Sequence, residues 1–153
     1  MKILIAVDGS PYGEAAIRSV AARPWPAGSE ARVLSVVDWT SGPGIRDSLP
    51  QNILEEMEAS GRAHAAVIAD RAIARFRESE AQIMPIDKVV LVGPAKTVIL
   101  EEAERWGADL IVLGSHGYRG YKRFLLGSVS QAVAAEARCS VEIVRTPAIA
   151  AES

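Results

Sequence analysis

Residues 106–117 read WGADLIVLGSHG, and they hold the end of one element, all of the next and the start of a glycine-rich loop. Gly107 is the residue type that most often follows a helix, because it adopts a left-handed backbone without a Cβ clash. Residues 110–113 are apolar on both faces, as in a parallel strand that helices cover on both sides. The stretch therefore predicts a helix–strand–loop unit of an α/β domain.

The same alternation extends along the chain in both directions. Short apolar runs of strand length lie at residues 3–7, 33–37, 89–92, 110–113 and 141–144, the last interrupted by Glu142. Helical patterns lie between them, at residues 11–22, 52–80, 95–106 and 128–137. The order βαβαβαβαβ predicts a three-layer α/β/α sandwich with a five-stranded parallel sheet and right-handed crossovers.

Local signals support the predicted helices. Ser10 is the expected N-cap of the first helix, and Ser128 followed by Gln131 has the spacing of a capping box. Residues 52–80 repeat apolar side chains every three or four positions from Leu54 onward, which predicts one continuous helical face.

Composition narrows the class of protein. The chain has 153 residues and a net charge of −2, so we expect one domain over residues 1–146, with residues 147–153 as a tail. Near-neutrality argues against nucleic-acid and membrane partners. Cys139 is the only cysteine, and His64 and His116 are the only histidines, so neither a disulfide nor a zinc site is expected. With no leader-like or membrane-spanning run in sight, we interpret the protein as soluble and cytoplasmic.

Ligands of open parallel sheets bind beyond the carboxyl ends of the strands, where the strand order reverses. The most informative of these ends has the pattern Gly114-x₂-Gly117-x₉-Gly127-Ser128. Glycines let backbone amides approach an anion, and a helix that starts there adds unpaired N–H groups. The hydroxyls of Ser128 and Ser130 are further candidate donors to phosphate. The pattern therefore predicts a phosphate cradle, with Arg119, Lys122 and Arg123 as candidate counter-charges.

Other nucleotide motifs do not fit. The first strand is followed by DGSPYG rather than GxGxxG, and Gly93-Pro94-Ala95-Lys96-Thr97 lacks the two glycines of a P-loop. The third strand ends at Gly93, where a response regulator has a phosphorylatable aspartate. A flavodoxin-type phosphate loop at Ser10 stays open as a weaker alternative.

Four stretches, KILIAVDGSP, LSVVD, WGADLIVLGSHG and FLLGSVSQAVAAEARCSVEIVR, together make the chain resemble the universal stress proteins of the ATP-binding subclass. This resemblance implies the strand order 3-2-1-4-5 of a Rossmann-like, adenine nucleotide alpha-hydrolase-like fold. It implies ATP, with or without Mg²⁺, as the ligand and no redox cofactor. It also implies a binding set of Val7, Asp8, Ser10, Val36, Leu113, Gly114, Gly117, Gly127, Ser128, Val129 and Ser130.

In this set, Val7, Asp8, Val36, Leu113 and Gly114 would lie at the adenosine side. The five residues from Gly117 onward would hold the phosphates. The resemblance also implies a homodimer through the last strand. Ser140 after Cys139 and the charge of Glu142 depart from the family pattern and weaken that expectation.

Three hypotheses about function remain open. The first is a nucleotide-dependent regulatory module of the stress response, with an unidentified protein partner. The second is a weak ATPase, for which Asp8, Asp38 and His116 are candidate residues and none is assigned as catalytic. The third is a nucleotide-free dimeric interaction protein. Simpler interpretations are also kept: Ser128 as a plain helix cap, Asp8 as a cap of the first helix or turn, and His116 as a loop residue bonded to backbone or solvent.

Overall fold

The structure is a computed structural model, and it describes residues 1–39, 44–79, 84–117 and 125–145. Its strands are β1 (Lys2–Val7), β2 (Glu30–Val37), β3 (Ile86–Val92), β4 (Leu110–Gly114) and β5 (Ser140–Val144). Its helices are α1 (Pro11–Ala21), α2 (Gln51–Arg77), α3 (Ala95–Trp106) and α4 (Ser128–Glu136), with a short 3₁₀ helix, η1 (Ile45–Ser48). The five strands form one parallel sheet in the order β3-β2-β1-β4-β5, which confirms the predicted fold class.

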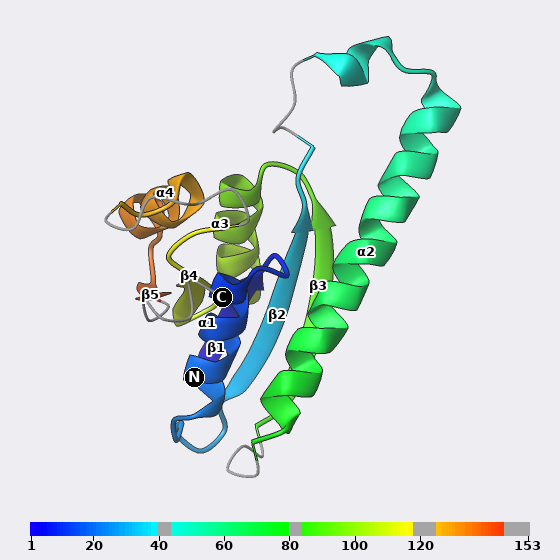
Figure 1. Cartoon of the computed structure of the whole chain (residues 1–153). Helices are drawn as coiled ribbons and strands as arrows, with labels where there is room; N and C mark the ends of the chain where they lie inside the picture. Colours follow the sequence, from blue (N-terminus) through cyan, green and yellow to red (C-terminus); the bar gives the residue numbers. More distant parts are fainter. Residues whose placement is uncertain (40–43, 80–83, 118–124, 146–153) are drawn as a thin grey trace.

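Two apolar cores lie on opposite faces of this sheet. Ile3 and Ile5 of β1 pack in one core with residues of α1 and α2, and Leu4 packs in the other with residues of α3 and α4. Figure 1 shows the helices divided between the two faces in this way. Alternate residues of a strand point to opposite faces, so the runs that are apolar at every position serve both cores.

The order of the strands reverses at β1. This strand pairs with β2 on one side and with β4 on the other, with Ile3 opposite Leu110 and Ala6 opposite Leu113. The chain adds β2 and β3 outward from β1, then crosses to the other side for β4 and β5. The ends of β1 and β4 are therefore neighbours at the carboxyl edge of the sheet, which is where ligands bind in this class of fold.

Helix α2 is buried along only part of its length. Its buried residues are Ala65, Ala69, Ala72 and Phe76, all in its second half, whereas Met57 is 40% exposed. In Figure 1 the first turns of α2 extend past the carboxyl end of the sheet. The apolar face predicted from Leu54 onward is thus continuous in sequence but covered by the sheet in its second half. No helix of the described residues is long and apolar enough to cross a membrane.

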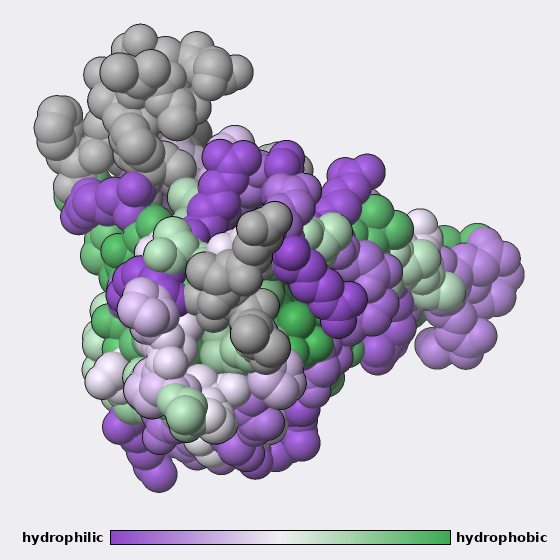
Figure 2. Space-filling model, turned by 90° about the horizontal axis from the view of Figure 1, so that it is seen from below, coloured by the Kyte–Doolittle hydropathy of each residue, from purple (hydrophilic) through white to green (hydrophobic). Residues whose placement is uncertain are grey.

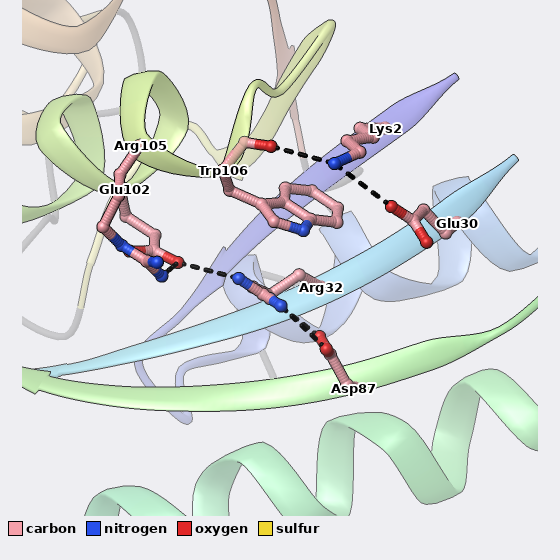
Figure 3. A network of polar contacts seen from close by, with 7 residues as sticks. All are labelled: Lys2, Glu30, Arg32, Asp87, Glu102, Arg105 and Trp106. Carbon is pink, nitrogen blue, oxygen red and sulfur yellow. Dashed lines mark hydrogen bonds and ion pairs between the residues drawn. The ribbon is translucent and has the colours of Figure 1, made fainter.

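A network of charged side chains links α3 to the amino ends of the strands, opposite the carboxyl edge described above (Figure 3). The carboxylate of Glu102, whose side chain is 1% exposed, accepts bonds from Arg105 Nε at 2.8 Å and from Arg32 Nη1 at 3.1 Å. Arg32 also makes two 2.9 Å bonds to Asp87 of β3, and this hydrogen bonding raises the pKa of its guanidinium. The buried carboxylate is therefore fully paired.

The indole of Trp106 completes this attachment. Its ring lies between Arg32, whose Cζ is 4.7 Å from the ring centroid, and Lys2, whose Nζ is 5.3 Å from it. The backbone carbonyl of Trp106 also accepts a bond from Lys2 Nζ. From the amino ends of the strands, the described surface is mostly hydrophilic, with smaller apolar patches between the charged side chains (Figure 2).

Glu102→Ala should lower the free energy of unfolding by about 2–4 kcal/mol, because it leaves the half-buried Arg32 without its buried partner. Glu104 on the same helix is a matched control, since its pair with Arg138 is exposed on both sides. Glu104→Ala should cost less than about 1 kcal/mol. Urea unfolding followed by circular dichroism measures both, and equal losses would contradict a stabilising role for the buried pair.

Candidate functional site

The chain turns sharply where β1 ends. Gly9 has a φ of 82°, and the backbone N–H of Ser10 donates to Asp8 Oδ1 at 2.9 Å. Ser10 Oγ then accepts from the N–H of Gly13 at 3.3 Å, which confirms Ser10 as the N-cap of α1. Ser10 is 1% exposed, so its side chain shapes the turn from within. Asp8 is held by its bond to Ser10 with its carboxylate at the exposed tip of β1.

Gly114 allows α1 to pack directly on the end of β4. A Cβ at this position would lie 2.6 Å from three atoms of Tyr12, two of them backbone. The carbonyl of Gly114 accepts a bond from Ser130 Oγ of α4 at 2.8 Å. This glycine therefore has a packing reason that the sequence pattern did not reveal, and it joins α1, β4 and α4 at one point.

Backbone hydrogen bonds tie the residue after β4 to β5 and to the start of α4. The N–H of Ser115 donates to the carbonyl of Val144 at 3.0 Å, and the N–H of Gly127 donates to the carbonyl of Ser115 at 2.8 Å. The second bond brings the start of α4 back to the end of β4 across the intervening loop. A Cβ on Gly127 would lie 3.3 Å from the α-carbon of His116, so the two ends of that loop are in van der Waals contact.

Gly117 lies beside the carboxylate of Asp8. A Cβ on Gly117 would stand 2.9 Å from Asp8 Oδ2. The structure thus brings together Asp8, Gly114, Gly117 and Gly127, as the sequence predicted. A Cβ at either glycine would meet Asp8 or the backbone of Ser115 and His116, so the missing side chains let these segments of the chain approach one another closely.

The start of α4 differs from the predicted capping box. Gly127, not Ser128, is the N-cap, and it makes no side-chain cap bond; Gln131 instead donates to the carbonyl of Leu126 at 2.9 Å. Ser128 is therefore not a plain helix cap. The N–H groups of Ser128, Val129 and Ser130 have no acceptor within the helix, because the first turn of any helix lacks one. They make this helix end electropositive.

Ser130 differs from its predicted role as a hydroxyl donor to phosphate. Its Oγ donates to the carbonyl of Gly114, and the residue is 3% exposed. Only its backbone N–H remains for a ligand. The predicted counter-charges Arg119, Lys122 and Arg123 lie outside the described residues, and so do residues 147–153.

His116 has side-chain partners that the sequence did not indicate. Its Nδ1 lies 3.1 Å from Ser115 Oγ, and its ring centroid lies 5.2 Å from that of Tyr12 at an interplanar angle of 52°. Its Nε2 is buried and has no hydrogen-bond partner. His116 is a loop residue, as expected, but its described hydrogen-bond contact is with the side chain of Ser115 rather than with backbone or solvent. Tyr12 was missed altogether, although it lies in the first turn of α1, directly after the turn that the sequence marked.

The adenosine side of the predicted set is apolar. Val7 and Leu113 are 7% and 4% exposed, and Val36 packs against the second core. Asp38 Oδ2 accepts a bond from the N–H of Ala95 at 2.9 Å, so this candidate catalytic carboxylate helps to start α3. Trp39 packs against Gly61 of α2, and Arg46 lies over its ring at 5.5 Å.

Glu142 does not place an unpaired charge at the edge of the sheet. Its carboxylate accepts two bonds from Arg23 Nη2, at 2.8 and 2.9 Å, on the face that α1 covers. The charge of Glu142 is thus offset within the chain, and the expectation that it discourages pairing at this edge stays a prediction. Cys139 is half-buried, and burial raises the pKa of its thiol. The described residues contain no group of three acidic, histidine or cysteine side chains that could hold a metal ion.

The sequence profile of the Universal stress protein family matches residues 1–145. The chain belongs to the universal stress protein family. It is 30% identical over 149 residues to universal stress protein YxiE of Bacillus subtilis, a match that covers 94% of this chain and 98% of that protein. It is 46% identical over 81 residues to universal stress protein A homolog 2 of Coxiella burnetii. This match spans 52% of this chain and 55%, about half, of that relative.

Solved structures agree with this family assignment. Protein MJ0577 superimposes with a TM-score of 0.80 at 27% identity, covering 95% of this chain and 96% of that one. Among universal stress proteins of the same fold, one is in complex with cAMP, one from Arabidopsis thaliana has AMP bound, and one from Archaeoglobus fulgidus is in complex with dAMP. Their TM-scores are 0.68, 0.69 and 0.60 at 22%, 17% and 22% identity, and each covers 94% or more of both chains.

Gly114→Ala should destabilise the protein by about 2 kcal/mol or more, because the new methyl group meets the backbone of Tyr12 in a packed interface. Gly117→Ala should cost about 1 kcal/mol or less, since its methyl group meets the end of an exposed side chain, Asp8 Oδ2, rather than backbone. Chemical denaturation of both variants checks the ranking. A Gly114→Ala variant as stable as Gly117→Ala would contradict the close approach of α1 to β4.

Proposed function

We propose that this chain is an adenine nucleotide-binding universal stress protein, with ATP as its ligand and nucleotide-dependent regulation as its role. The observation that supports this most is the junction of β1, β4 and α4. There Asp8, Gly117 and Gly127 meet in front of three helix N–H groups without helical acceptors. Helix N-termini of this kind bind phosphate through their amides and their dipole.

In this proposal the two ends of the nucleotide meet different surfaces. Gly117, Gly127 and the amides of Ser128, Val129 and Ser130 hold the phosphates. The apolar side, with Val7, Val36, Leu113 and Gly114, takes the adenosine, and Asp8 lies between. Adenine nucleotides bound to relatives of the same fold support this assignment of ligand class.

A magnesium ion fits the proposal only as a companion of the phosphates. Mg²⁺ in nucleotide sites commonly takes one or two carboxylates and several phosphate oxygens. Asp8 is the carboxylate that the described residues bring against the cradle. Regulation then follows if the nucleotide binds two conformations of the chain with different affinity.

ATP should raise the melting temperature of the purified protein, since a ligand at 100 times its Kd adds about 2.7 kcal/mol of stability. Gly117→Val should abolish that shift while the protein stays folded, because the larger side chain fills the cradle. Differential scanning fluorimetry measures the shift. A shift unchanged in Gly117→Val would contradict this location, and none in the wild type would contradict nucleotide binding.

Phosphate release under the same conditions tests the ATPase alternative. Turnover that disappears in Asp8→Ala would favour hydrolysis over simple binding, whereas the regulatory proposal expects ATP to remain intact over the binding measurement. Mass spectrometry of the gently purified protein would separate both from the nucleotide-free alternative.

We also propose a homodimer formed through β5. Among the described strands β5 pairs only with β4, so its outer edge has unpaired backbone groups. Arg23 offsets the charge of Glu142, which would otherwise oppose pairing there.

Sedimentation should therefore give twice the chain mass of 16.3 kDa. Val141→Lys should shift the protein toward monomer, because it sets like charges against each other across the new pair. Val141 also packs against the second core, so circular dichroism must show that this variant stays folded. Val67→Lys, on the exposed face of α2, is the control and should remain dimeric. A monomeric wild type, or a dimer insensitive to Val141→Lys, would contradict this interface.

A further inference from the structure

Arg145 follows directly after β5 and is an exposed cation at the carboxyl edge of the sheet. No hydrogen bond or ion pair joins it to another residue in the part of the chain that the structure describes. Most of the described arginines instead pair with a carboxylate, as Arg23 does with Glu142 and Arg138 with Glu104. The guanidinium of Arg145 therefore keeps all of its donors for solvent or for a ligand.

The alternation of side chains along β5 decides on which face of the sheet Arg145 lies. Val141 and Ile143 pack in the second core, with residues of α3 and α4. Val144 packs in the first core, and Glu142 bonds on the same side, the face of α1. Successive side chains of a strand point to opposite faces, so Arg145 continues the row of Val141 and Ile143. It thus lies on the face that α4 covers.

The start of α4 lies close to this position. In the register of β4 and β5, Gly114 is opposite Val144, so Ser115 and Arg145 are the next residues of the two chains. Paired strands are about 4.8 Å apart. Ser115 donates its N–H to the carbonyl of Val144 at 3.0 Å, and its carbonyl accepts from the N–H of Gly127, the N-cap of α4, at 2.8 Å. One residue therefore links the end of β5 to the first turn of α4.

We infer, on the basis of the proposed function, that Arg145 is a further ligand-contacting residue, whose guanidinium donates to oxygens of the phosphate held at the start of α4. The planar fork of arginine donors matches two oxygens of a phosphate. The first turn of α4 has no acidic residue that would compete for this cation, and the carboxylate of Asp8 lies beside Gly117 instead. Arg145 adds recognition of charge to a cradle of backbone amides, so the site favours phosphorylated over unphosphorylated adenosine.

Isothermal titration calorimetry with ATP and with adenosine tests this contact. Arg145→Gln should weaken ATP binding about tenfold, because a hydrogen bond between charged groups is lost. Adenosine has no phosphate and should bind wild type and variant within about a factor of two. Arg145→Lys keeps the charge but not the fork, so its loss of ATP affinity should be smaller than that of Arg145→Gln. Equal losses in the two variants would contradict recognition of charge.

Arg138→Gln is the matched control. Arg138 lies just before the amino end of β5 and is exposed, so this change removes the same charge at the opposite end of the same strand. It should leave ATP affinity within about a factor of two of the wild type. Raising the NaCl concentration from about 0.05 to about 0.5 M should narrow the difference between wild type and Arg145→Gln, because salt screens an exposed ion pair.

Sedimentation separates a direct contact from an effect on assembly, since Arg145 lies at the end of the strand through which we propose the dimer. Arg145→Gln should have the wild-type mass, and a loss of ATP affinity that occurs only with a change of mass would contradict the contact. If Arg145→Gln binds ATP as tightly as the wild type, the inference is wrong while the proposed function stands. If the wild type binds no nucleotide at all, the proposed function itself fails.

Discussion

The close approach of α1 to the end of β4 at Gly114 is the constraint on which the carboxyl edge depends. The space that a Cβ would take there is filled by Tyr12 backbone, so any side chain would push the helix off the strand. The same residue accepts the hydroxyl of Ser130 and thereby aligns α4 with β4. This contact, together with the pairing of β1 with β4, positions the first residues after β4, the start of α4 and the turn after β1.

The amino and carboxyl ends of the strands differ in how their polar groups are hydrogen-bonded. At the amino edge, Glu102, Arg32 and Asp87 satisfy one another, so that edge contributes stability. At the carboxyl edge, the first turn of α4 and the Nε2 of His116 remain without partners among the described residues. Polar groups without partners are common at functional sites, and here they lie where the strand order reverses.

Much of the fold could be predicted from the sequence because its signals are local. Strands that are apolar on both faces, a proline and a serine at the start of α1, and the glycine at position 107 give nearly the observed boundaries. The glycine spacing likewise predicted residues that the structure brings to the carboxyl edge, where we propose the cradle. The prediction for α2 was less complete, because the sequence could not show that the sheet covers only the second half of this helix.

The contacts that the sequence did not predict share one cause, which is that the deciding partners are not visible in the local sequence. The charge of Glu142 is offset by Arg23, which lies 119 residues earlier. The hydroxyl of Ser130, expected to donate to phosphate, is used by Gly114, and the capping box at Ser128 fails because Gln131 bonds backwards to Leu126. Tyr12 and the ring contacts of His116 have no signal beyond their position near a marked turn.

The central claim is that backbone amides at the start of α4 and the glycines beside it bind the phosphates of an adenine nucleotide. Amide proton–nitrogen correlation spectra during an ATP titration test this most directly. The account predicts that the largest shifts fall on Gly117 and Gly127 and on the three residues that follow Gly127, whereas Arg32 and Glu102 at the amino edge stay unchanged. Shifts that are absent, or that gather at the amino edge, would contradict it.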